Sequence, residues 1–169
     1  MKIPAHQLSS SVQKLLLPCY LITGDEPLLV QEALDTIRIG ARQLEFGLRE
    51  LYVASPGFDW LELSNSSANL SLFAEKRIIE LRLPSGKPGR QGSKIILELL
   101  ENADDKLLIL ISAPKLNRST AASKWAKTAE SRGALVQVWP VNRREFPSWI
   151  GRRMQKAGLK PDKNAIRLI

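Results

Sequence analysis

The chain has 169 residues, of which 44% are apolar and 25% are charged, and it contains one cysteine and one histidine. This length is enough for one domain with a hydrophobic core, and the composition argues against disorder. A single cysteine and a single histidine exclude an internal disulfide, the usual zinc sites and a histidine cluster. The longest apolar run, residues 107–111, is far shorter than the roughly 20 residues of a membrane helix. We therefore expect a protein without a membrane span, in a reducing cytoplasm.

The formal net charge of +8 is concentrated near the carboxyl end. Residues 142–169 contain eight basic and two acidic side chains, a charge of +6, whereas the first 141 residues stand at +2. A basic segment favours anionic partners such as nucleic acid, although a helix with one basic face is often simply solvated. Phe146 and Trp149 belong to the apolar stripe of this segment, so they do not form a stacking platform for single strands.

Short aliphatic segments alternate with helical patterns along the first 140 residues. The first helical pattern places Val30, Leu34, Ile37, Ala41 and Leu44 at spacings of four, three, four and three, which is one face of a helix. The alternation predicts a three-layer α/β domain with a central, mostly parallel, five-stranded sheet. The predicted strands are residues 19–23, 49–53, 77–83, 106–112 and 134–139, and the other helical regions are 58–70, 95–103 and 119–129.

A boundary follows the last predicted strand, at the sequence WPVNRREF. Residues 143–157 have a helical pattern, and another helix is expected to begin at Pro161 or Asp162. No capping signal precedes the last residue, Ile169. The sequence thus predicts an α/β domain over residues 1–140, followed by the truncated beginning of a helical second domain over residues 141–169.

The turn after the first predicted strand has the layout of a phosphate-binding loop without its chemistry. A working loop needs glycines, a lysine and a hydroxyl residue to hold phosphate and magnesium. Here Gly24 is followed by Asp25 and Glu26, which would repel a triphosphate and which we interpret as helix caps. In strand 77–83 we expect Glu80 to face solvent or lie at an edge rather than bind a metal. The sequence predicts no catalytic residue and no cofactor.

The segments CYLITGDEPLLVQEALDTIR, SLFAEKRIIELRLPSGKPG and LLILISAPKLNRSTAASKW give the chain a recognisable likeness. It resembles the delta subunit family of the bacterial DNA polymerase III clamp loader over essentially its whole length. The resemblance implies an AAA+-like domain without working nucleotide motifs, in a noncatalytic subunit of the cytoplasmic replisome. The partners it implies are the sliding clamp, the ATPase and delta-prime type loader subunits, and primed DNA through the complex.

The sequence NLSLF resembles the Q-L-x-L-F pattern of bacterial clamp-binding peptides. The resemblance therefore assigns clamp binding to Asn69, Leu70, Ser71, Leu72 and Phe73, with Asn69 in place of the usual glutamine. It leaves Lys76 and Arg77 as possible flanking contacts to acidic clamp residues.

Other interpretations remain open from the residues themselves. The three apolar side chains of the motif could pack a helix onto the sheet, although Leu72 would lie about 200° around a helix from Leu70. A degenerate nucleotide-dependent enzyme and a basic nucleic-acid-binding module are the alternative functions. Binding to a purified sliding clamp would separate the clamp-opening function from both.

Overall fold

The computed structural model describes residues 1–68, 75–159 and 162. In chain order, the helices and strands are β1 (Lys2–Pro4), a 3-10 helix (Ala5–Gln7), α1 (Leu8–Lys14), β2 (Cys19–Thr23), α2 (Pro27–Gln43), β3 (Leu48–Val53), α3 (Trp60–Ala68), β4 (Arg77–Arg82), α4 (Gly89–Asn102), β5 (Leu107–Ala113), α5 (Arg118–Ala121), α6 (Lys124–Arg132), β6 (Ala134–Gln137) and α7 (Phe146–Lys156).

The strands form one sheet in the order β1-β6-β2-β5-β4-β3, and every pair in it is parallel. The predicted α/β class is confirmed, but the predicted count of five strands is wrong because β1 adds a sixth at one edge. β1 is too short to produce a clear alternating pattern, and only Ile3 of its three residues is buried. Its pairing with β6 places the amino-terminal residues beside residues 135–137.

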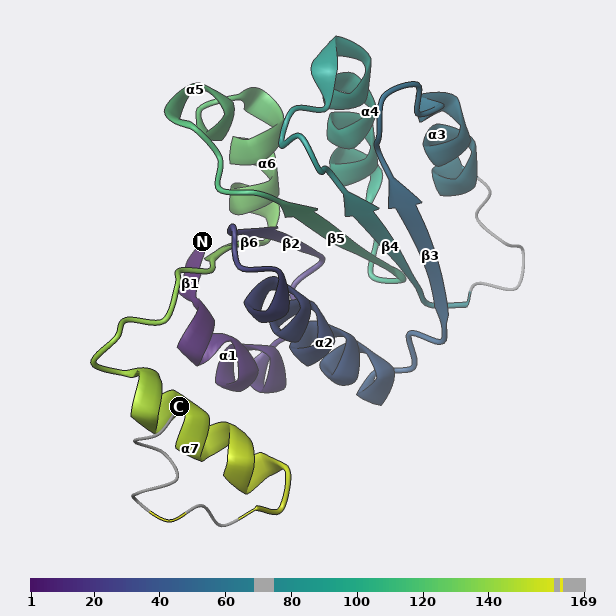
Figure 1. The fold of residues 1–169 in the computed structure, drawn as a ribbon. Coiled ribbons are helices and arrows are strands. Elements are labelled where there is room, and N and C mark those ends of the chain that lie inside the picture. Colours follow the sequence, from purple (N-terminus) through teal and green to yellow (C-terminus); the bar gives the residue numbers. More distant parts are fainter. Residues whose placement is uncertain (69–74, 160–161, 163–169) are drawn as a thin grey trace. The chain divides into compact units, whose positions relative to one another are not determined.

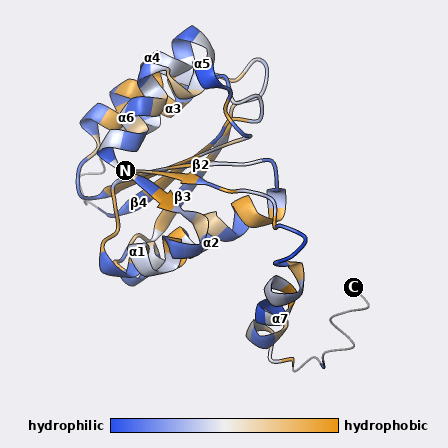
Figure 2. Cartoon of the chain, turned by 90° about the vertical axis from the view of Figure 1, so that its left-hand side faces the viewer, coloured by the Kyte–Doolittle hydropathy of each residue, from blue (hydrophilic) through white to orange (hydrophobic). Residues whose placement is uncertain are grey.

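Helices cover both faces of the sheet (Figures 1 and 2), as expected for parallel strands buried on both sides. Every residue of β2 and of β5 is buried, which agrees with their aliphatic sequences and their places at the centre of the sheet. On one face Leu34, Ile37 and Ala41 of α2 pack with the strand residues Ile22 and Leu110. Leu44 of the predicted stripe is exposed, because α2 ends at Gln43.

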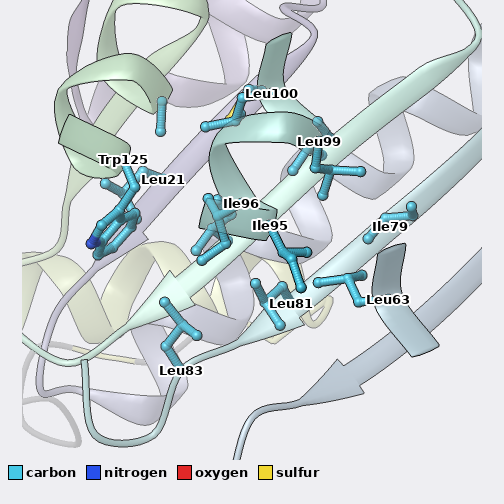
Figure 3. Close-up of a cluster of buried hydrophobic side chains, with 14 of the residues drawn as sticks. Leu21, Leu63, Ile79, Leu81, Leu83, Ile95, Ile96, Leu99, Leu100 and Trp125 are labelled. Carbon is cyan, nitrogen blue, oxygen red and sulfur yellow. The ribbon is translucent and has the colours of Figure 1, made fainter. Parts of the chain in front are cut away.

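The opposite face carries the larger core cluster, part of which is drawn in Figure 3. Leu63 of α3, Ile96 of α4 and Trp125 of α6 lie over Ile79 and Leu81 of β4 and their neighbours in this cluster. All five side chains are fully or almost fully buried. α3 is therefore anchored to the sheet through its first half, before the chain reaches the segment that carries the predicted motif.

The chain divides into two compact units, Met1–Val138 and Trp139–Ile169. Within the second unit, the Phe146 and Trp149 rings of α7 stack with their centroids 5.4 Å apart, and the Arg153 guanidinium lies 4.4 Å from the Trp149 ring centroid. The further helix predicted from Pro161 or Asp162 falls outside the described residues, apart from Asp162 itself. The assignment of residues 141–169 to the beginning of a helical domain remains a prediction.

Candidate functional site

The predicted clamp-binding residues lie between α3 and β4, and all five fall outside the described part of the chain. They are Asn69, Leu70, Ser71, Leu72 and Phe73. The described residues on either side include Ser66, in the last turn of α3, Lys76, directly before β4, and Arg77, the first residue of β4. The structure therefore describes the residues that flank the motif and not the motif itself.

Glu50 of β3 connects the two sides of this segment. Its Oε2 accepts hydrogen bonds from the Ser66 hydroxyl and, at 2.7 Å, from the Tyr52 hydroxyl. Its Oε1 lies 3.3 Å from Nη1 of Arg77. This carboxylate of β3 thus contacts both the last turn of α3 and the first residue of β4.

These contacts change the pKa values of the two residues that β3 contributes. Burial acts to raise the pKa of Glu50, but the hydrogen bonds from Ser66 and Tyr52 and the charge of Arg77 outweigh it, so the pKa is lowered. Burial raises the pKa of Tyr52, and its hydrogen bond to the Glu50 carboxylate acts in the same direction. Tyr52 therefore remains a neutral hydrogen-bond donor to a charged acceptor, which is the stronger kind of hydrogen bond.

Lys76 and Arg77, the expected flanking contacts, both interact within the chain. Lys76 donates from Nζ to the Leu44 carbonyl at 2.9 Å, and Nζ lies 5.7 Å from the centroid of the Phe46 ring. Its own carbonyl accepts the Gly47 N–H at 3.2 Å. The Arg77 side chain is only 12% exposed and is paired with Glu50. A contact from either residue to a partner remains a prediction.

The loop between β2 and α2 is fixed by contacts to the neighbouring strands. Gly24 donates its N–H to the Ala113 carbonyl at 3.1 Å, and a Cβ at this position would lie 2.6 Å from the Val138 carbonyl oxygen. Gly24 is therefore required by the close approach of the chain after β6. Asp25 accepts the Lys115 N–H at 2.9 Å, and Glu26 occupies the N-cap position of α2 without a side-chain cap hydrogen bond. Glu26 thus holds the expected N-cap position without the expected side-chain hydrogen bond, and the Asp25 carboxylate bonds to the chain after β5 instead.

A cavity of about 360 Å³ lies at the carboxyl ends of β2, β4 and β5, where ligands of open α/β sheets commonly bind. Its lining is mainly apolar and contains Val30, Leu83 and Pro84, with Asp25 on one side. Arg82 also lines the cavity, and its guanidinium is hydrogen-bonded to Glu80 at 3.0 and 3.2 Å. The cavity thus has an acid and an engaged arginine where a triphosphate would need lysine and backbone donors.

Glu80 does not face solvent, and the expectation that it would is wrong. Its side chain is completely buried on the α2 face of β4, which is not an edge strand. Three arginines surround it: Arg82, Arg49 with Nη1 3.5 Å from Oε2, and Arg38 with Nε 3.2 Å from Oε2. Single-sequence reasoning missed this cluster because the three arginines come from three different elements. Glu80 is accordingly a structural ion-pair centre.

None of the helices in residues 1–68 and 75–159 is long and apolar enough to span a membrane. Within the same described parts of the chain, no group of three or more histidine, cysteine, aspartate or glutamate side chains is arranged to hold a metal ion.

A parallel six-stranded sheet flanked on both faces by helices (Figure 1), with Asp25 and Glu26 in the loop after β2, defines a three-layer α/β domain. Residues 20–138 match the family model described as DNA polymerase III, delta subunit, and the chain belongs to this family. Two relatives named DNA polymerase III subunit delta, from Escherichia coli strain K12 and from Haemophilus influenzae, are 26% and 27% identical over 96% and 98% of this chain. The chain spans about half the length of these relatives, 48% and 49%.

Solved structures support the same fold. The DNA clamp loader delta protein of Bacillus subtilis matches with a TM-score of 0.65 at 15% identity, over 90% of this chain and 48% of that one. DnaA of Aquifex aeolicus, solved with AMPPCP bound, matches with a TM-score of 0.57 at 14% identity, over 96% of this chain and 54% of that one. At these identities the likeness establishes the fold alone.

Proposed function

We propose that this chain is the clamp-binding part of a noncatalytic clamp-loader subunit of the bacterial DNA polymerase III holoenzyme. The observation that carries the proposal is the match of residues 20–138 to the delta subunit family, which extends from β2 to just beyond β6. In this function the chain binds the ring-shaped sliding clamp and favours its open form for loading onto primed DNA. ATPase and delta-prime type subunits complete the loader, and the complex works in the bacterial cytoplasm.

The clamp-binding element in this proposal is the motif formed by Asn69, Leu70, Ser71, Leu72 and Phe73. Burial of each large apolar side chain in a hydrophobic pocket contributes roughly 1.5–3 kcal/mol. The three together contribute about 4–9 kcal/mol before the cost of association, so the motif alone binds at best at about micromolar concentrations. Tighter binding needs contacts beyond the motif.

Ring opening follows from differential binding. A protein that binds both forms of the clamp equally shifts nothing, so the subunit opens the ring only to the extent that it prefers the open form. No nucleotide chemistry is required of this chain for that step. The supporting observations are the acids Asp25 and Glu26 in the β2–α2 loop and the pairing of Arg82 with Glu80 beside the cavity.

The direct test is the double change Leu72→Ala, Phe73→Ala, measured by binding to the purified sliding clamp and by thermal unfolding. We expect clamp binding to be lost while the melting temperature stays close to that of the parent. The matched control is Leu61→Ala, which truncates an exposed leucine of α3 and should leave binding unchanged. Core side chains would behave differently, because their truncation costs about 2–5 kcal/mol of stability. A stable double mutant that still binds the clamp would place the contact elsewhere.

Calorimetric titration with ATP tests the noncatalytic part of the proposal. We expect no binding at about millimolar ATP, with or without magnesium, because two carboxylates occupy the loop in place of a lysine and a hydroxyl residue. A stoichiometric, magnesium-dependent site would favour the alternative of a nucleotide-dependent enzyme.

A further inference from the structure

The cavity at the carboxyl ends of β2, β4 and β5 has three proline residues in its wall. Pro27, Pro84 and Pro114 line it, and one of them follows each of these strands. Proline has no backbone N–H, and its ring fixes the φ angle near −65°. The three prolines therefore form rigid, apolar surfaces, which cannot surround a phosphate group with backbone donors as a phosphate-binding loop does.

Two polar side chains line the same cavity side by side. Arg82 of β4 and Ser112 of β5 are register partners on neighbouring strands, and both are lining residues. Side chains at paired positions of adjacent strands lie next to each other on one face of the sheet. Arg82 shares its face with Glu80, two positions earlier in the strand, which is the face that α2 covers.

Both side chains have hydrogen-bonding capacity that the described part of the chain does not use. Ser112 is only 7% exposed, and its hydroxyl makes no hydrogen bond to any described residue. Arg82 bonds to Glu80 through Nε and Nη2, while its Nη1 donates to no described residue. A buried hydroxyl without a partner is uncommon and destabilising, so this pair indicates a place for a ligand acceptor.

The charges around the cavity limit what this acceptor can be. The three arginines around Glu80, together with Glu80 and Asp35, carry three positive and two negative charges, a net charge of +1. One further negative charge beside Arg82 would balance this group. Asp25 also lines the cavity and is held there by the Lys115 N–H, so a ligand with several negative charges is disfavoured.

We propose that this cavity binds a small aromatic carboxylate. The ring lies against the proline and aliphatic walls, and the carboxylate accepts hydrogen bonds from the Ser112 hydroxyl and from Nη1 of Arg82. An aromatic ring suits rigid apolar walls, because it provides a large contact area and loses little conformational freedom on binding. The volume of about 360 Å³ is within the usual range of small-molecule sites.

This site is separate from the proposed clamp-binding motif. The motif precedes the first residue of β4 in the sequence, whereas the cavity is lined by the last residue of β4 and the two residues after it. Ligand binding in the cavity is therefore independent of clamp binding.

The test is a titration of the ¹⁵N-labelled chain with 2-naphthoate, followed by amide NMR signals. We expect saturable shifts at Gly24, Leu83 and Ala113, with a Kd of about 1 mM, as is usual for a ligand with about a dozen non-hydrogen atoms. The neutral analogue 2-naphthamide should bind about tenfold more weakly, because it lacks the charge-assisted hydrogen bonds. Shifts confined to the basic residues 142–169 would contradict the site.

Three variants locate the ligand. Ser112→Ala removes a hydroxyl that has no described partner, so it should melt like the parent and bind 2-naphthoate about fivefold more weakly. Val30→Phe fills the cavity from α2 and should abolish binding. Leu28→Phe is its matched control, because Leu28 is an exposed residue of the same helix that does not line the cavity, and it should bind like the parent.

Arg82→Gln tests the charge separately from stability. It also removes the contact to Glu80, so a lower melting temperature is expected, but the preference for 2-naphthoate over 2-naphthamide should disappear as well. If 2-naphthoate causes no saturable shift at Gly24, Leu83 and Ala113, the proposed site is wrong. It is equally wrong if Ser112→Ala and Val30→Phe both bind 2-naphthoate as tightly as the parent.

Discussion

Glu50 and Glu80 are acids on neighbouring strands whose side chains face opposite sides of the sheet. Glu50 faces α3 and is partly exposed, whereas Glu80 faces α2 and is completely buried. Burying a carboxylate is costly unless it is paired, and both acids are paired with arginines. The two acids therefore have different surroundings. The partners of Glu80 lie inside the domain, whereas two partners of Glu50, Ser66 and Arg77, flank the proposed clamp-binding motif.

Removal of the Glu80 carboxylate should destabilise the domain strongly. Glu80→Ala leaves Arg38, Arg49 and Arg82 close together without their shared partner, and breaking a buried ion pair from one side costs about 3–5 kcal/mol. Urea unfolding measures the loss. Glu98→Ala is the matched control, because Glu98 is paired with Lys94 at 3.6 Å on the exposed side of α4, and such surface pairs contribute at most about 1 kcal/mol. Equal losses in the two variants would contradict the assignment of Glu80 as an ion-pair centre.

The lowered pKa of Glu50 predicts a dependence of stability on acid pH. The folded state binds this proton less readily than the unfolded chain, so the stabilising contribution is complete above the usual pKa of 4.5 and is lost as the pH falls through the folded-state pKa. Glu50→Gln removes the titrating group. We therefore expect the difference in unfolding free energy between parent and variant to shrink as the pH falls from neutral to well below 4.5. A difference that stays constant over this range would show that the charge of Glu50 does not stabilise the fold.

At the scale of the elements, five of the six strands could be predicted from the sequence, including β3 at one edge, whereas β1 at the other edge could not. β2 and β5 are short aliphatic runs buried on both faces, so their composition alone identifies them. β1 has one buried residue, and its place in the sheet depends on pairing with β6 at the other end of the domain. The burial of Glu80 was missed for the same reason, since its arginine partners come from α2, β3 and β4.

The candidate site, too, can be predicted from the sequence only in part. A contiguous motif such as residues 69–73 can be found by its resemblance to a peptide pattern. The network that flanks it cannot, because Glu50 is brought to Ser66 and Arg77 only when β3 pairs with β4 and α3 packs over them. The alternation along β3 is a weak signal for this network, since it places Glu50 on the same face of the strand as Tyr52.

The contact between α3 and α4 gives a prediction about packing. Gly92 of α4 is buried against the Trp60 ring of α3, and a Cβ at this position would lie 2.4 Å from Cζ2 of that ring. Replacement of a helical glycine by alanine normally stabilises by about 1 kcal/mol. Here Gly92→Ala should instead destabilise by about 1–3 kcal/mol, because Trp60 is also packed edge-on against Phe58 at 5.0 Å and cannot move freely. Thermal unfolding and tryptophan fluorescence measure the effect.

Gln91→Ala is the control for Gly92→Ala, because Gln91 is an exposed neighbour in the same helix. This control should be neutral or slightly stabilising, as expected from helix propensity alone. If Gly92→Ala proved equally harmless, the close packing of α3 on α4 would be contradicted.

For the whole molecule, the uneven charge sets the expected behaviour toward nucleic acid. Residues 142–169 carry +6 and the preceding 141 residues only +2, so the attraction to phosphate comes mainly from the carboxyl-terminal segment. Arg153 packs against the Trp149 ring, whereas Arg152 is exposed on α7 and makes a 3.5 Å contact to the Ser148 hydroxyl. Electrostatic contacts of this kind do not distinguish one DNA sequence from another.

We therefore expect weak DNA binding that falls steeply with salt, measured by fluorescence anisotropy with a labelled duplex. Six or more phosphate contacts would reduce the affinity by about 10³-fold or more between 50 and 200 mM salt, because each contact releases condensed counterions. Arg152→Gln should reduce the magnitude of the slope of log affinity against log salt concentration by about one, because one phosphate contact is lost. Lys94→Gln, which removes an exposed cation of α4, should leave the slope unchanged. A sequence-specific complex that persists at high salt would contradict this prediction, since phosphate contacts alone cannot produce it.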